Sequence, residues 1–162
     1  MGLAFVKGLA FSQSLPTVGI NTLDVVAAGQ SAGNLPLVCT LPAGRGRLAV
    51  CTYINDRPLS PAANWRANGS PSIMTAEALN ESIIQDSVVC GDLNITERLV
   101  LKKNGHIRLV SPALSTRRPA ILAELAYTRW QDGDVDDVAS LAPLYLHIAE
   151  PIPDGTSGAS PV

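Results

Sequence analysis

The segment LVLKKNGHIRLV, residues 99–110, places the strongest constraint on the fold. Asn104-Gly105 lies at its centre, between two runs of β-favouring residues. Asparagine and glycine both tolerate the positive φ that a type I′ turn requires, so the segment predicts a two-residue loop joining two antiparallel strands. This hairpin tip is either a solvated loop end, which is the commoner case, or a contact for an anionic partner. The side chains that project from it are Lys102, Lys103, His106 and Arg108.

The composition is that of a single domain with a low density of charge. A chain of 162 residues is long enough to bury a core without disulfides or metals. Charged residues make up 16% of the chain, below the roughly 25% usual for soluble domains, and the mean hydropathy is +0.20. Some of the apolar surface is therefore expected to meet a partner.

Charge and hydropathy argue against two classes of partner. A net charge of −2 and a pI near 5.6 argue against an extended nucleic-acid-binding surface. No apolar run approaches the roughly 18 residues of a membrane span. Lys7 interrupts the N-terminal apolar segment before it can form a signal-peptide core. We expect a soluble, non-secreted chain that contacts neither a membrane nor, directly, nucleic acid.

The N-terminal residues 1–16 contain the tetrapeptide GLAF twice and then SQSLP, a pattern that predicts an extended arm. An apolar arm must pack on its own domain or reach a neighbouring subunit, because exposed Phe5 and Phe11 would favour aggregation. The tail EPIPDGTSGASPV consists of turn and linker residues. The expected organisation is an arm over 1–16, one β-rich domain over 17–149 and a flexible tail over 150–162.

A second hairpin is predicted in LVCTLPAGRGRLAVCTY, turning through Gly44-Arg45-Gly46. A three-residue loop sets Cys39 opposite Cys51. The pair is either a cross-strand disulfide or two buried thiols, and thiols are favoured because neighbouring strands often carry unbonded cysteines. Three cysteines without a CxxC spacing indicate no zinc site and no disulfide scaffold.

The remaining segments predict one helix and several short strands. TAEALNESIIQD, residues 75–86, is typical of a helix with Thr75 as N-cap. Strands are expected at 18–28, 35–41, 47–54, 121–128 and 144–149, although the alanines of 121–128 leave a helix open there. Together these elements predict a mainly β fold, an antiparallel β-sandwich or barrel with jelly-roll-like topology, one short helix and extended terminal arms.

Residues 55–72 form the longest irregular loop, rich in proline and without periodicity. Trp65 and Arg66 lie near its middle, and both residue types favour interfaces with a protein partner or a sugar ring. The alternative, which is favoured, is that Trp65 packs the loop onto the core.

One motif resembles a catalytic element. Gly29-Gln30-Ser31-Ala32-Gly33 matches the G-x-S-x-G pattern of a nucleophile elbow, and His147 follows it in the chain. The elbow requires a helix after the serine, whereas Asn34-Leu35-Pro36 leads into a β-type run. An ordinary turn of small residues is therefore the favoured interpretation.

Three aspartates stand at alternate positions, as the first ligands of a calcium loop do: Asp132, Asp134 and Asp136. Asp137 and Pro143 occupy the positions where an EF-hand has glycine and glutamate. A solvated acidic turn is favoured over a loose calcium site. The sequence predicts no catalytic residue, no metal site and no cofactor.

An apolar arm, a loose tail and the lack of a catalytic motif are typical of subunits of symmetric assemblies. In its GLAFVKGLAF arm, its proline-punctuated strands and the segment ERLVLKKNGHIRLV, the chain resembles bacteriophage virion structural proteins of the head-decoration (cement) type. The resemblance implies a non-enzymatic capsid subunit in the virion that forms a homo-oligomer, with a trimer favoured, on a major capsid protein. The alternative is a carbohydrate- or receptor-binding β-sandwich module using residues 55–72. The residues expected to bind partners are Phe5, Phe11, Trp65, Arg66, Lys102, Lys103 and His106.

Overall fold

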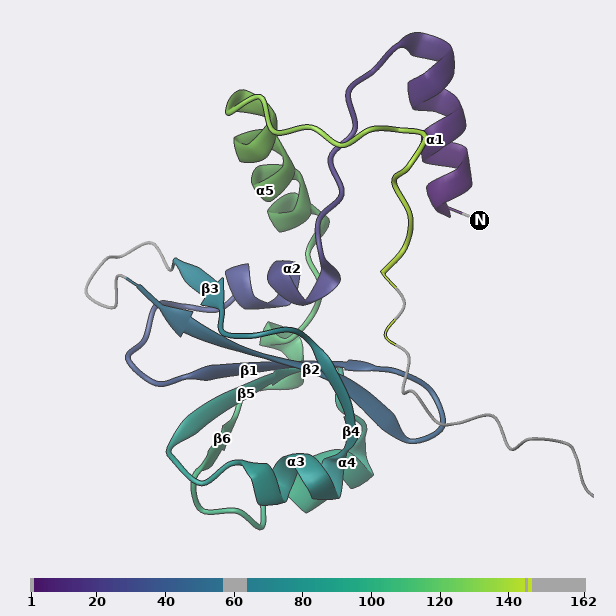
Figure 1. Cartoon of the computed structure of the whole chain (residues 1–162). Helices are drawn as coiled ribbons and strands as arrows, with labels where there is room; N and C mark the ends of the chain where they lie inside the picture. Colours follow the sequence, from purple (N-terminus) through teal and green to yellow (C-terminus); the bar gives the residue numbers. More distant parts are fainter. Residues whose placement is uncertain (1, 57–63, 145, 147–162) are drawn as a thin grey trace, which may run out of the picture.

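The computed structural model describes residues 2–56, 64–144 and 146, and Figure 1 traces their arrangement. The helices are α1 (Gly2–Gln13), α2 (Thr22–Ala28), α3 (Ala76–Ser82), α4 (Ile95–Leu101) and α5 (Pro119–Gln131), with a 3₁₀ turn, η1, at Pro112–Leu114. The strands are β1 (Leu37–Pro42), β2 (Arg47–Asn55), β3 (Trp65–Ala67), β4 (Ser72–Thr75), β5 (Ser87–Gly91) and β6 (Ile107–Leu109).

The strands form one mixed sheet in the order β3-β2-β1-β5-β6, and β4 pairs with the other end of β2. Strand β2 is antiparallel to β1, β3 and β4, whereas β1–β5 and β5–β6 are parallel pairs. Parallel neighbours need a crossover, which α4 provides between β5 and β6. The prediction of a mainly β antiparallel sandwich or barrel with jelly-roll-like topology is therefore wrong, and the fold is a mixed α/β sheet.

Helices cover both faces of the sheet (Figure 1). Successive side chains of a strand point to opposite faces, so Val38 and Cys39 of β1 belong to different cores. On one face α2 contributes Val26 to the core that contains Cys39. On the other face Leu79 of α3 and Leu101 of α4 pack with Val38. Helices α1 and α5 stand beyond α2, on its side of the sheet (Figure 1).

The predicted hairpin at residues 99–110 is wrong. Leu99–Leu101 end α4, which begins with a capping box: Asn94 Oδ1 accepts from Glu97 N at 2.9 Å, and Glu97 Oε2 accepts from Asn94 N at 2.8 Å. The box satisfies otherwise unpaired amides at the helix start and stabilises a helix over the local β pattern. The side chain of Asn104 donates to carbonyl oxygens of the α3 region, and β6 pairs in parallel with β5.

Three further segments are helical where extended structure was expected. Residues 1–16 contain α1 instead of an extended arm. Residues 18–28 contain α2, because Asn21 caps it by accepting from Leu23 N at 2.9 Å. Residues 121–128 lie in α5, where Pro119 occupies the first turn, a position that favours proline. The predicted strand 144–149 and tail 150–162 fall largely outside the described residues, and the domain boundaries stay a prediction.

Two local predictions are confirmed. Thr75 is the N-cap of α3, its Oγ1 accepting from Ala78 N at 3.2 Å, although the helix ends at Ser82 instead of continuing to residue 86. The hairpin of β1 and β2 pairs Cys39 with Cys51 in the expected register. Both signals are short-range, since a cap and a tight loop act within a few residues.

The three cysteines form a row of buried free thiols across β2, β1 and β5. Cys39 is paired in register with Cys51 and with Cys90, and its Sγ lies 3.5 Å from Sγ of Cys90. The expected thiols are therefore present and the Cys39–Cys51 disulfide is not. The hydrogen bond with Cys90, together with burial, raises the pKa of Cys39, and burial raises the pKa of Cys51. The raised pKa values keep the thiols of Cys39 and Cys51 protonated and unreactive.

Candidate protein-binding surface

Apolar residues lie on every side of helix α1, yet the helix is largely exposed. Phe5 is 74% exposed and Phe11 is 83% exposed, and Ala10 is the one buried residue of the helix within the described chain. A helix that is apolar on all sides is normally buried. The outer side of α1 is therefore a surface that another chain can cover.

The inner side of α1 is attached through its one charged residue. Lys7 Nζ donates to the carbonyl oxygens of Ala139 and Leu141, both at 3.0 Å. From the helical repeat, Phe5 and Leu9 lie on the side opposite Lys7, Gly8 lies about a right angle away from it, and Phe11 follows it by one turn. Because Lys7 is the one charged residue of α1 and is bonded to the domain, the exposed part of the helix carries no other charge. Gly8 leaves a gap between the aromatic side chains of Phe5 and Phe11, each about one turn away from it.

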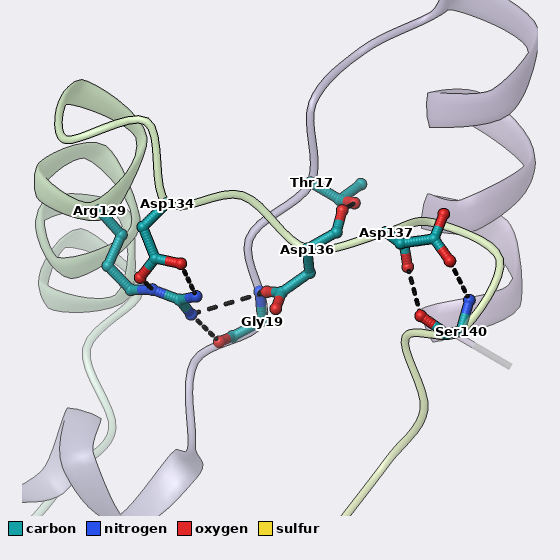
Figure 2. A network of polar contacts seen from close by, with 7 residues as sticks. All are labelled: Thr17, Gly19, Arg129, Asp134, Asp136, Asp137 and Ser140. Carbon is teal, nitrogen blue, oxygen red and sulfur yellow. Dashed lines mark hydrogen bonds and ion pairs between the residues drawn. The ribbon is translucent and has the colours of Figure 1, made fainter.

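A polar network holds the linker after α1 against the segment after α5 (Figure 2). Thr17 and Asp136 form an antiparallel bridge, and Gly19 N donates to Asp136 Oδ2 at 2.6 Å. Arg129 of α5 donates to the Gly19 carbonyl at 2.8 Å and makes paired hydrogen bonds to Asp134 at 2.6 and 2.9 Å. This network fixes where α1 leaves the domain.

The same network involves two of the three aspartates of the calcium alternative, Asp134 and Asp136. The carboxylate of Asp134 is taken by the guanidinium of Arg129, and that of Asp136 by Gly19 N and Arg129. In the part of the chain that the structure describes, no group of three or more histidine, cysteine, aspartate or glutamate side chains is arranged to hold a metal ion. These pairings give the acidic turn a structural role, and the expected lack of a metal site stays a prediction.

Ionised carboxylates stabilise this network. The hydrogen bond from Arg129 lowers the pKa of Asp134, and hydrogen bonds from Ser140 and from the Ala139 amide lower the pKa of Asp137. Both groups are exposed, so water and salt weaken each contribution.

Acidification is therefore expected to loosen the linker. A carboxylate whose folded pKa lies below its unfolded value stabilises the fold above that unfolded value, about 3.9 for aspartate, and the stabilisation is lost as the pH falls through the folded pKa. We expect the amides of residues 17–21 to gain fast motion, seen as lower NMR order parameters, when the pH falls from about 6 to about 3. The amides of β1 serve as the internal control. Unchanged order in 17–21 at the low pH would contradict the role of Asp134, which holds the Arg129 that binds Gly19.

A cleft of about 890 Å³ lies beside α1. It separates the inner side of the helix from the ends of β1 and β4 and from α5. Its apolar lining includes Leu3, Val6, Leu41, Ile73, Leu122 and Leu144.

Helix α5 adds further exposed apolar surface on the same side of the sheet (Figure 1). Leu122, Tyr127 and Trp130 are all exposed, and the rings of Tyr127 and Trp130 lie 5.6 Å apart, centroid to centroid. These residues were missed because 121–128 was interpreted as a strand. Pro119 before an alanine-rich segment was the signal for a helix.

The residues expected to bind partners do not form one site. Phe5 and Phe11 lie on α1, while Lys102, Lys103 and His106 follow α4 on the opposite face of the sheet (Figure 1). His106 Nδ1 lies 2.9 Å from Asp86 Oδ1, and Arg108 is 3.5 Å from the same carboxylate, so the basic turn is partly neutralised. Binding by any of these residues stays a prediction.

Trp65 and Arg66 have different roles in the structure. Trp65 packs against the core under α2, and its Nε1 donates to the Gln30 carbonyl at 3.3 Å. Arg66 is exposed and paired with Asp56 at 2.9 Å. The favoured core-packing interpretation of Trp65 is confirmed.

The environment of Ser31 is that of a turn. Helix α2 precedes it and ends at Ala28, with Gly29 as its C-cap, and strand β1 is the next element, so no helix begins after the serine as an elbow requires. The nucleophile-elbow alternative is wrong.

No family model and no curated protein matches this chain. Two solved structures from Pseudomonas aeruginosa match its fold: one is described as an uncharacterized protein with similarity to peptidase YeaZ, and the other as YeaZ. Each has a TM-score of 0.64 and 18% sequence identity, with 90% and 89% of this chain covered. The chain spans 66% of the length of each of those structures.

The comparison corrects the expected identity. The fold is similar to that of YeaZ, a mixed α/β arrangement, over nine tenths of this chain. The resemblance to bacteriophage head-decoration proteins is wrong, and with it the expected capsid function, the β-sandwich binding module and the location in a virion. No helix among the described residues is long and apolar enough to cross a membrane. The chain has a YeaZ-like fold.

Proposed function

We propose that this chain is a non-catalytic subunit that acts as a homodimer, in which α1 of one copy covers α1 of a second. The observation that carries the proposal is the exposure of Phe5 and Phe11, which flank Gly8 on a helix whose one charged residue, Lys7, is bonded to the domain. Burying a phenylalanine side chain contributes about 1.5–3 kcal/mol. An interface between two copies of α1 buries four such side chains, two from each copy.

The chemistry of α1 favours a second copy as its partner. A two-fold interface brings the same patch of both subunits together, so the patch must be self-complementary. An uncharged apolar patch meets this condition because two copies do not repel each other. The gap at Gly8, flanked by Phe5 and Phe11, offers space for an aromatic side chain of the opposing helix. The trimer expected in the sequence analysis was implied by the resemblance to capsid proteins. A single helix surface that meets its own copy favours a dimer instead.

The environment of the cysteines supports a non-catalytic role. A cysteine nucleophile needs a lowered pKa, whereas the pKa values of Cys39 and Cys51 are raised. The ring of His106 has Asp86 as an orienting partner. Among the described residues, it makes no hydrogen bond with a cysteine thiol or a serine hydroxyl. These cysteine and histidine side chains therefore give no support for the peptidase activity named in the description of one structural neighbour.

Light scattering across a dilution series tests the proposal. We expect a mass twice that of the 17.0 kDa chain at high concentration, falling toward one chain on dilution. A single-chain mass at every concentration would refute self-association, and a three-chain mass would refute two-fold pairing.

A further inference from the structure

A hollow of about 370 Å³ lies on the face of the sheet opposite α1. Strand β3 ends at Ala67 and β4 begins at Ser72, so both pair with β2 but leave a bowed segment between them. Gly69 allows the bow because its φ is +100°, a conformation that other residues rarely adopt. The hollow lies between this segment, the middle of β2 and the end of α3.

The floor of the hollow is apolar and belongs to the core under α3. Val38, Val50, Leu79 and Ile83 are buried there, and Met74 packs beside them. Such a floor offers contact to an apolar face of a ligand and little hydrogen bonding to water.

The rim of the hollow is polar and uncharged. Its side chains that make no hydrogen bond to another described residue are Thr52, Asn68, Ser70, Ser72 and Gln85. No lysine, arginine, aspartate or glutamate of the described chain lines it. Each amide of Asn68 and Gln85 presents a donor and an acceptor side by side.

We propose that this hollow binds an uncharged small molecule with an apolar face and an amide-like edge, which is the chemistry of a free nucleobase. A charged ligand would lose hydration at the apolar floor without gaining an opposite charge. A flat neutral ring places its face on Met74 and Ile83, while its alternating donors and acceptors meet the amides and hydroxyls of the rim. The volume lies at the lower end of the range for ligand pockets, which suits a single ring system.

Titration of the full chain with uracil tests this assignment. Orotate is the charged control, because it differs from uracil only by a carboxylate on the same ring. Uracil is expected to cause saturable shifts in the NMR amide signals of Thr52, Asn68 and Ser72, and orotate none. Absence of a saturable shift with uracil would overturn the proposal, as would equal shifts with orotate.

Two variants and one control locate the binding. Ser72→Leu fills the hollow and is expected to abolish the uracil shifts, while Asn68→Ala removes one amide and is expected to weaken binding several-fold. Asn64→Ala removes an exposed amide from the same stretch outside the hollow, and binding is expected to match the parent. Uracil binding unchanged in Ser72→Leu would place the ligand elsewhere and overturn the proposal. Light scattering of the same samples separates this result from the pairing of α1, which lies on the other face.

Discussion

Replacing Gly91 by alanine is expected to cost about 4 kcal/mol or more of unfolding free energy, a large part of the 5–15 kcal/mol that keeps a domain folded. A Cβ at this position would overlap the carbonyl oxygen of Thr40 and lie 2.7 Å from its Oγ1. The φ of Gly91 is +123°, which strains any other residue. Thr40 cannot move away, because it is fully buried and its Oγ1 donates to the Cys90 carbonyl at 3.1 Å.

Chemical denaturation followed by circular dichroism measures this effect. Gly105→Ala is the matched control, because a Cβ at Gly105 meets nothing within 4 Å. The control is expected to unfold at nearly the parental denaturant concentration, whereas Gly91→Ala unfolds far earlier or accumulates as insoluble protein. If Gly91→Ala lost less than about 1 kcal/mol, the contact between the ends of β1 and β5 would be less rigid than its geometry indicates.

The double variant Phe5→Glu/Phe11→Glu is expected to be monomeric where the parent chain is dimeric. It removes four phenylalanines from the paired interface and places four carboxylates there, and buried unpaired carboxylates are costly. A loss of about 4 kcal/mol, a conservative figure, raises the dissociation constant about a thousandfold. Light scattering over the dilution range used for the parent measures the change.

A matched control distinguishes a specific interface on α1 from nonspecific association through exposed apolar residues. Ile84→Glu/Ile95→Glu also exchanges two strongly exposed apolar residues for glutamate, since Ile84 is 82% and Ile95 80% exposed. Ile84 follows α3 and Ile95 begins α4, the helices on the opposite face of the sheet. This variant is expected to keep the parental mass. Dissociation of the control, or survival of the dimer in the Phe5→Glu/Phe11→Glu variant, would show that α1 is not the interface.

The sequence allowed correct prediction where the determinant is local. Thr75 as a helix cap and the pairing of Cys39 with Cys51 depend on a few neighbouring residues, and both are present in the structure. The segment 99–110 shows the limit of such reasoning. Asn104-Gly105 was interpreted by its turn propensity alone, while the capping box Asn94–Glu97 and the burial of Leu101 favour a helix directly before it.

Parallel pairing of β1, β5 and β6 was not predictable from short patterns, because strands far apart in sequence meet there. For the candidate surface, the sequence raised Phe5 and Phe11 as apolar residues in need of a partner, which stays a prediction, and it missed the helix that carries them. Apolar residues lie on every side of α1, so no helical stripe stands out. Tyr127 and Trp130 were missed with the helix that displays them.

The outer strands of the sheet limit how copies of this chain can associate. Strands β3 and β6 each have three residues and β4 has four, so each edge strand exposes only a short row of unpaired amides and carbonyls. Short edges resist the strand-to-strand stacking that leads to fibres, because each new copy would gain few main-chain hydrogen bonds. The apolar surface of the molecule lies instead on helices, whose backbone groups are already paired. In the proposed pairing, contact between copies would use these helices, and a two-fold pair ends growth at two subunits.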